Sequence, residues 1–347
     1  MKKEEKIRPR SNKTKKVNLK EKIFKCYYKE MEEKTKEYNN SHNTNVNFYL
    51  AQELNKKDFI NNVIELSYFY DKNFTGNKDF MHIPSMKQVA NNIIHFPIML
   101  ATQKLSDGID DVLGATTIKI EKHKSMKENP LFPTRGETVL SITGVLTKFN
   151  NIYNEENRVR GIGKELYKSA IRGAININKK QKIRLICEID CRNDKSLSAV
   201  TKAVKDLQLE GYDICSYITG YYEIYKKKEL LEAPTFIIEI DLNSNKYTEE
   251  KVEFSYIHCK SQKLYKDLVK ELKKNTTEQK KYSNVVGNKS VYYHSIKPIN
   301  TENVELEIGT TADGNNRKPS INPVIEYVVS KKTINTTTST DNILAVE

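Results

Sequence analysis

The spacing of apolar side chains predicts alternating helices and strands over residues 46–243. Apolar residues recur every three or four positions in several segments, as in helices with one buried face. These predicted helices cover 56–70, 85–94, 161–176 and 195–207. Other segments are extended and rich in apolar residues, which is typical of strands. These predicted strands cover 46–51, 96–104, 112–121, 138–149, 182–190, 212–225 and 235–242. The order of the elements indicates a fold of the α/β (α+β) class.

Both ends of the chain have a different pattern. Residues 1–45 are highly charged and read as a flexible arm, with a helical stretch at 19–38. Beyond residue 243, short alternating segments and a basic amphipathic stretch predict a smaller α+β unit. The expected strands there cover 252–258, 290–296 and 324–329, and the expected helix covers 261–274. We therefore expect a basic arm (1–45), a core (46–243), a C-terminal extension of unknown role (244–330) and a disordered tail (331–347).

Charge is concentrated in the arm. The chain has 58 Lys and Arg against 45 Asp and Glu, a formal net charge of +13. Residues 1–25 contain 11 basic and 3 acidic residues, so about +8 of the excess lies there. Such an arm could bind nucleic acid, an anionic membrane surface or another polyanion weakly.

Other classes of protein are disfavoured. No apolar run approaches the length of a membrane span, and the charged N-terminus lacks the apolar core of a signal peptide. The five cysteines form no CxxC pair and the six histidines show no metal-ligand spacing, so we expect no metal and no disulfide framework. The default compartment is then the cytoplasm. The sequence leaves open whether the chain forms oligomers.

A candidate anion-binding motif lies between the fourth predicted core strand and the helix that follows it. Its sequence is Arg158-Val159-Arg160-Gly161-Ile162-Gly163-Lys164. The first turn of a helix offers unpaired N–H groups and the positive end of the dipole, and glycine lets an anion approach the backbone. A Walker loop does not fit, because one residue separates the glycines and Glu165 follows the lysine. A Rossmann fingerprint fits weakly, because the third glycine is replaced by Leu166.

The spacing Arg158-x-x-Gly161-x-Gly163 resembles the acetyl-coenzyme A pyrophosphate loop of the GNAT superfamily of N-acetyltransferases. The element order over about residues 46–243 is similar to the GNAT core. Three further matches are Val112-Leu113-Gly114 on the third strand, Asn193 after the fifth strand, and Gly211-Tyr212 after the following helix. The tyrosine that often serves as general acid in this family has no clear match, since Val200 stands at that place.

This resemblance implies a mixed sheet whose fourth and fifth strands splay to admit the pantetheine arm of acetyl-coenzyme A as cosubstrate. The residues implied to bind it are Arg158, Val159, Arg160, Gly161, Ile162, Gly163 and Lys164 in the loop, Val145, Leu146 and Thr147 on the fourth strand, and Asn193. The Leu146 N–H is the candidate donor to the thioester oxygen.

A general base for the acceptor amine is harder to identify. Glu188 on the fifth strand is our candidate, while Glu137 and Asp190 are alternatives. Tyr221 and Tyr222 could line the acceptor site. The expected function is N-acyl transfer from acetyl-coenzyme A to an amine of a small molecule or protein, by direct attack in a ternary complex. The alternative is a non-catalytic acyl-coenzyme A-binding or interaction protein with the same fold.

Overall fold

The computed structural model describes most of the predicted core. The described residues are 19–42, 44–51, 56–74, 84–104, 110–122, 138–147, 161–179, 181–191, 193–226, 229–230, 234–243, 257–259, 272–285, 289–309 and 324–329. The tail from residue 331, the first 18 residues and Glu137 therefore lie outside the described residues.

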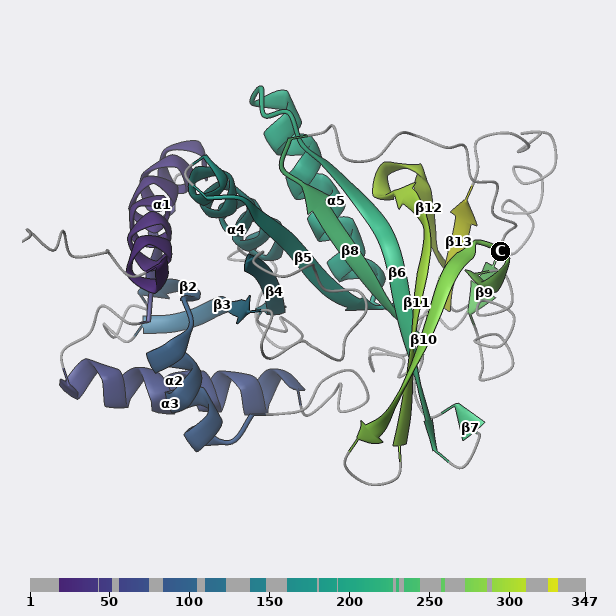
Figure 1. Cartoon of the computed structure of the whole chain (residues 1–347). Coiled ribbons are helices and arrows are strands. Elements are labelled where there is room, and N and C mark those ends of the chain that lie inside the picture. The colour runs from purple at the N-terminus through teal and green to yellow at the C-terminus, as the bar shows by residue number, and fades with distance from the viewer. Residues whose placement is uncertain are drawn as a thin grey trace, which may run out of the picture.

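A ten-stranded mixed sheet forms the centre of the protein (Figure 1). Its strands follow the order β1-β2-β3-β4-β5-β8-β6-β11-β10, with β7 paired to β6 outside this path. The strands are β1 (Val46–Leu50), β2 (Ile98–Lys104), β3 (Asp110–Lys122), β4 (Thr138–Thr147), β5 (Ile183–Asp190), β6 (Cys215–Lys226), β7 (Glu229–Leu230), β8 (Thr235–Asp241), β10 (Thr276–Val285) and β11 (Lys289–Asn300). Only β4 and β5 are paired in parallel among these strands. The α/β (α+β) class and the mixed sheet are thus confirmed.

Helices cover both faces of this sheet (Figure 1). Three of them, α1 (Leu19–His42), α4 (Ile162–Asn178) and α5 (Asp194–Leu209), share one large core with β3 to β6 and β8, on what we call the α4 face of the sheet. The other two, α2 (Lys56–Phe74) and α3 (Met86–His95), build a second core against β2 and β3, on the α2 face. Ser85 caps α3 through a reciprocal pair of hydrogen bonds with Gln88, as its position before an apolar periodic segment suggests. None of the helices that the structure describes is long and apolar enough to cross a membrane.

The N-terminal boundary differs from the sequence-based expectation. Residues 19–42 form α1, so the helical stretch predicted at 19–38 is present, but this helix packs into the main core and is not part of a flexible arm. Four buried side chains share one face of this helix: Ile23, Tyr27, Met31 and Tyr38. The charged residues between them concealed this stripe in the sequence. Residues 1–18, the rest of the predicted arm, lie outside the described residues, so their flexibility stays a prediction.

Close contact fixes α1 on α4. The Tyr27 hydroxyl donates a hydrogen bond to the Ala170 carbonyl oxygen at 3.0 Å. Gly173 leaves room for the Tyr27 ring, because a Cβ atom there would lie 2.2 Å from Tyr27 Cε1. Around this contact the buried Lys34 ammonium pairs with Glu165. Loss of α1 would therefore uncover a charged as well as an apolar surface on α4.

Glu30 is a buried carboxyl group of this interface whose hydrogen bonding is incomplete. Its side chain is 3% exposed, and its Oε1 atom accepts no hydrogen bond from the described residues. Burial raises the pKa of Glu30 to about 8, although the charges of Arg172 and Lys34 act to lower it. The unfolded chain releases this proton near the ordinary pKa of 4.5. Stability should therefore fall as pH rises between these two values, because the folded state holds a proton that the unfolded state has lost.

We expect Glu30→Gln to remove this pH dependence. The amide resembles the protonated carboxyl group and does not titrate, so the variant should lose less unfolding free energy between about pH 5 and about pH 8 than the wild type. Urea unfolding at a series of pH values measures this difference.

Glu37 provides the matched control, with the same chemical change on the same helix. Burial acts to raise the pKa of Glu37, but the hydrogen bonds from Arg172 and the charges of Lys34 and Lys168 outweigh it and lower this pKa to about 2. Glu37→Gln should consequently destabilise the protein at neutral pH, and the wild-type contribution should disappear as pH falls from 4.5 toward 2. Equal effects of the two substitutions at neutral pH would contradict this account.

The C-terminal extension does not form one separate unit. β10 and β11 continue the main sheet, with β11 paired to β6. A second, three-stranded sheet contains β9 (Ile257–Cys259), β12 (Val304–Gly309) and β13 (Val324–Val329). The predicted strands at 290–296 and 324–329 are confirmed, while most of the predicted helix at 261–274 lies outside the described residues. The core boundary at residue 243 therefore cuts through a continuous sheet.

Candidate functional site

The parallel ladder between β4 and β5 stops before either strand ends. It runs from Thr138 opposite Ile183 to Ile142 opposite Cys187. Beyond this point β4 continues to Thr147 paired only with β3, and β5 continues to Asp190 paired only with β8. The facing edges of the two strands therefore present backbone groups that no ladder uses. This is the splay that the sequence resemblance implied.

A bulge bends β4 just after the splay begins. Thr143 lies opposite Thr117 and Leu146 opposite Ala115, so Gly144 and Val145 together face one residue of β3. Gly144 has φ of +61°, the left-handed conformation that the first residue of a glycine bulge requires. Such a bulge turns backbone groups out of the ladder, which is how an extended strand can direct an N–H toward a ligand.

The three predicted β4 residues follow directly from this bulge. Val145 packs toward the main core on the α4 face, whereas Leu146 packs against the core under α2 and α3. Thr147 ends the strand beneath the first turn of α4. The structure thus places Val145, Leu146 and Thr147 beside the splay. Which N–H group meets a ligand stays a prediction.

Helix α4 begins at the same place. Gly161 is its N-cap residue with φ of +84°, and no side chain caps the first turn. A Cβ atom on Gly163 would lie 3.3 Å from Thr147 Cγ2. The uncapped first turn and the positive dipole end therefore lie against the end of β4, without side chains on either glycine. This combination favours an anion.

Close packing also explains Gly114 on β3. A Cβ atom there would lie 2.7 Å from Ile162 Cγ2 and 3.0 Å from the Leu146 carbonyl oxygen. Glycine thus allows β3, β4 and the start of α4 to meet. The glycine of the Val-x-Gly pattern on β3 therefore has a packing role beside the start of α4.

Two predicted binding side chains are already engaged. The Lys164 ammonium lies 2.6 Å from Asp206 Oδ2 and 3.4 Å from Glu165 Oε1, so it joins α4 to α5. Asn193 is the N-cap of α5, and its Oδ1 atom accepts a hydrogen bond from the Ser196 N–H at 3.1 Å. Arg158, Val159 and Arg160 lie outside the described residues. The Lys164 ammonium is therefore paired within the protein, and the group that Lys164 can direct to an anion in this structure is its backbone N–H.

Glu188 is the first residue of β5 after the ladder with β4 ends. Strand alternation puts it on the α2 face, opposite Cys187, whose side chain lies in the main core on the α4 face. Its side chain is exposed, and its Oε2 atom accepts a hydrogen bond from the Tyr222 hydroxyl at 3.2 Å. Protein atoms crowd the carboxyl group, and this loss of solvation raises the pKa of Glu188, while the Tyr222 hydrogen bond and the Lys119 charge act to lower it. An accessible carboxylate with a raised pKa suits proton transfer.

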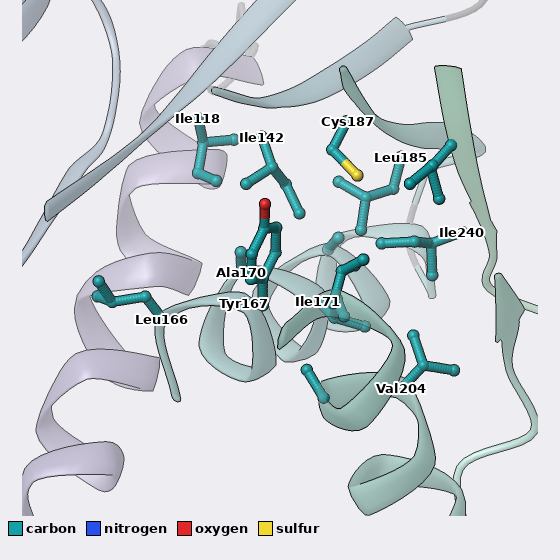
Figure 2. Close-up of a cluster of buried hydrophobic side chains, with 14 of the residues drawn as sticks. Ile118, Ile142, Leu166, Tyr167, Ala170, Ile171, Leu185, Cys187, Val204 and Ile240 are labelled. Atoms are coloured by element: carbon teal, nitrogen blue, oxygen red, sulfur yellow. The ribbon is translucent and has the colours of Figure 1, made fainter. Parts of the chain in front are cut away.

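A buried hydroxyl lies at the point where the splay begins. Tyr167 on α4 is directed toward Ile142 and Cys187, the last residues of the parallel ladder (Figure 2). Its hydroxyl is 2.7 Å from the Ser196 hydroxyl on α5, and burial raises its pKa strongly. Tyr167 thereby connects both helices to the sheet at this point. Val200, at the position where the GNAT tyrosine often stands, is buried in the core.

Several of these features had only a weak signal in the sequence. An isolated glycine in an apolar strand suggests a bulge, so the sequence indicated a bulge at Gly144. It did not indicate which residues of β3 lie opposite that bulge. The adjacent tyrosines 221 and 222 were indistinguishable before strand alternation was known. Tyr221 is buried on the α4 face and stacks on His294, with ring centroids 4.4 Å apart, so it lies on the face of the sheet opposite Glu188. Tyr222 lies on the α2 face with Glu188.

Among the described residues, no group of three or more His, Cys, Asp and Glu side chains is arranged so that it could hold a metal ion.

Comparisons with known proteins give matches at the level of structure alone. No family model and no curated protein matches the chain. Naa50 from Arabidopsis thaliana, in complex with the bisubstrate analogue CoA-Ac-MVNAL, is 16% identical with a TM-score of 0.29, over 56% of this chain and 97% of that chain. The diaminobutyrate acetyltransferase EctA from Paenibacillus lautus, in complex with its substrate and coenzyme A, is 10% identical with a TM-score of 0.31, over 57% and 96%. A Bacillus subtilis acetyltransferase in complex with CoA is 14% identical with a TM-score of 0.29, over 57% and 99%.

Matches with such low TM-scores and identities do not bear on the activity of this chain. Its own strand order, its parallel pair β4–β5 and the splay after Ile142 and Cys187 give it the mixed, splayed central sheet flanked by helices that its resemblance to the GNAT superfamily implied.

Proposed function

We propose that this protein is an N-acyltransferase of the GNAT type, which moves an acetyl group from acetyl-coenzyme A to an acceptor amine. The observation that carries this proposal is the meeting of three features at one place. The β4–β5 ladder ends at Ile142 and Cys187, a glycine bulge follows on β4, and the uncapped first turn of α4 lies against the end of that strand.

These features fit the parts of acetyl-coenzyme A. The N–H groups at the start of α4, from Ile162 to Lys164, would hold the pyrophosphate, with Arg158 and Arg160 as candidate charged partners. The unpaired edges of β4 and β5 would hold the pantetheine arm by its amides, near Val145 to Thr147. The Leu146 N–H is our candidate donor to the thioester oxygen. The cosubstrate supplies an activated acyl thioester, and these groups bind and orient it.

Glu188 would act on the acceptor. An amine must lose its proton to attack a carbonyl carbon, and Glu188 is an accessible carboxylate beside the splay, on the face away from α4. Its carboxylate would take the proton from the acceptor nitrogen, directly or through a water. The N–C bond then forms while the C–S bond breaks, and the thiolate leaves with its electron pair and takes up a proton as coenzyme A. No covalent intermediate on the protein is needed.

Turnover tests this proposal directly. Free thiol release from acetyl-coenzyme A should occur with at least one amine from a panel of polyamines, amino acids, aminoglycosides and lysine peptides. Coenzyme A should also raise the melting temperature by a few degrees, since a ligand at about 100 times its Kd adds about 2.7 kcal/mol to the free energy of unfolding. NAD and ATP at matched concentrations should raise it less. Binding of coenzyme A without turnover on any amine would favour the alternative, a non-catalytic acyl-coenzyme A-binding protein.

A further inference from the structure

The α2 face of the sheet carries an aromatic pair next to Glu188. Tyr222 on β6 and Tyr293 on β11 are direct cross-strand partners, so their side chains share one face. Their ring centroids are 5.4 Å apart and the rings are inclined by 48°. The Tyr222 hydroxyl reaches Glu188 Oε2 at 3.2 Å. A carboxylate and two aromatic rings thus form one continuous strip, which we call the Glu–Tyr strip.

The direction of this strip follows from the sheet order. From β5 the sheet continues through β8 to β6 and β11, with neighbouring strands about 4.8 Å apart. The strip therefore runs from the splay, where Glu188 lies, toward the far edge of the sheet. Lys119 on β3, whose charge acts on Glu188, lies toward the opposite edge.

Aromatic faces attract cations, and a neighbouring carboxylate strengthens that preference. An anionic group would instead meet the carboxylate of Glu188 and the negative faces of both rings. Mono-amines would use only the Glu188 end of the strip. A longer molecule with a second cation would use its whole length.

We propose that the acceptor is a diamine or longer polyamine, whose reacting amine lies beside Glu188 while a second ammonium group lies against Tyr222 and Tyr293. This inference takes the reaction from the function proposed above and adds the class of acceptor. The tyrosine pair then selects the substrate by its charge, and Glu188 takes part in both the selection and the proton transfer.

Equilibrium binding of a cation tests the strip without any turnover. Choline is the probe, because it cannot be acylated on nitrogen, and dimethylbutanol is its uncharged carbon isostere. Choline should bind at least about tenfold more tightly than the isostere by isothermal titration. Tyr293→Leu should weaken choline binding by about 3-fold or more, as expected for loss of one cation–π contact. Tyr222→Phe keeps the ring and should retain most of the binding. Tyr28→Leu, which removes an exposed tyrosine on α1, is the matched control and should have no effect.

Turnover with acceptors of equal length completes the test. The ratio of kcat/KM for cadaverine over pentylamine should exceed about tenfold in the wild type and fall by about 3-fold or more in Tyr293→Leu. Coenzyme A affinity and the circular dichroism spectrum of each variant should match the wild type. Choline binding no tighter than that of dimethylbutanol, or an unchanged acceptor ratio in folded Tyr293→Leu, would overturn the inference while leaving acyl transfer intact. Preferential choline binding in a protein that binds no coenzyme A would instead overturn the proposed reaction and leave the cation site standing.

Discussion

A Gly163→Asp variant is expected to bind coenzyme A at least about tenfold more weakly than the wild-type protein, a loss of about 1.4 kcal/mol. The substitution places a carboxylate in the first turn of α4, where we propose that the pyrophosphate binds. Like charges repel there, and the new Cβ atom enters the space between the helix and Thr147 Cγ2. The protein should remain folded, because an Asp near a helix N-terminus interacts favourably with the dipole. Isothermal titration with coenzyme A measures the change.

Two further variants show how much of the loss of coenzyme A affinity comes from the added charge, from the added side chain, and from charge far from the site. Gly163→Ala adds the same Cβ atom without a charge, so it should weaken binding less than Gly163→Asp. Asn176→Asp adds the same single charge at an exposed position near the other end of α4, and it should leave coenzyme affinity nearly unchanged. A folded Gly163→Asp protein with wild-type affinity would show that the first turn of α4 is not the phosphate site.

The sequence predicted the core elements because their signals are local. The strand at 183–190 is a short apolar run, and its neighbours α4 and α5 have strict helical spacing, so their predicted bounds fall within about three residues of those observed. The pair Ser85 and Gln88 marks the start of α3 in the same way. In each case burial on one side of a single element leaves a periodic trace in the residues of that element alone.

Features that depend on distant partners left a weaker trace. The strand β10 is rich in polar and charged residues, and its place at the edge of the sheet follows from pairing with β11 rather than from its own pattern. The charge of residues 1–45 predicted a flexible arm with a helical stretch at 19–38, but not that this helix packs into the core. Two charged residues, Lys34 and Glu30, lie on its buried face. Their partners Glu165 and Arg172 lie on α4, more than 130 residues further along the chain. Buried charge is unfavourable unless it is paired, and the sequence does not reveal the pairing.

In the candidate site, too, the features with a local signal could be predicted and those that depend on distant partners could not. The glycines of the α4 loop and Gly114 could be identified from spacing. Gly114 permits the close approach of Ile162 and Leu146, whereas Gly161 has a positive φ that favours glycine. The commitment of the Lys164 ammonium to Asp206 could not, because the pairing depends on how α5 packs beside α4. The hydrogen bond from Tyr222 to Glu188 joins strands that are separated in the sheet by β8, and it became visible only with the strand order.

Replacement of Glu188 by Gln should lower kcat by roughly 10²- to 10⁴-fold on the best acceptor amine, the range typical of a lost general base. Glutamine keeps the size of the side chain and can still accept a hydrogen bond from the Tyr222 hydroxyl, but it cannot take a proton. Coenzyme A affinity should not change, because Glu188 lies on the face of the sheet opposite α4. Glu33→Gln, the same chemical change at an exposed ion pair on α1, is the matched control and should leave kcat within about twofold. A folded Glu188→Gln enzyme with kcat within about threefold of wild type would exclude Glu188 as the base.

The pH profile distinguishes a base from a residue that only positions the acceptor. In the wild type the rate should rise with pH as Glu188 ionises, and burial places this step above the ordinary pKa of a glutamate. The Tyr222 hydroxyl stabilises the ionised form and so lowers the pKa of Glu188; in Tyr222→Phe the step should therefore move to higher pH. In Glu188→Gln the same step should be absent, and the remaining pH dependence should follow the ionisation of the acceptor amine and change when the acceptor is changed. A step that persists unmoved in both variants would assign the proton transfer to another group and leave Glu188 as a binding residue of the Glu–Tyr strip.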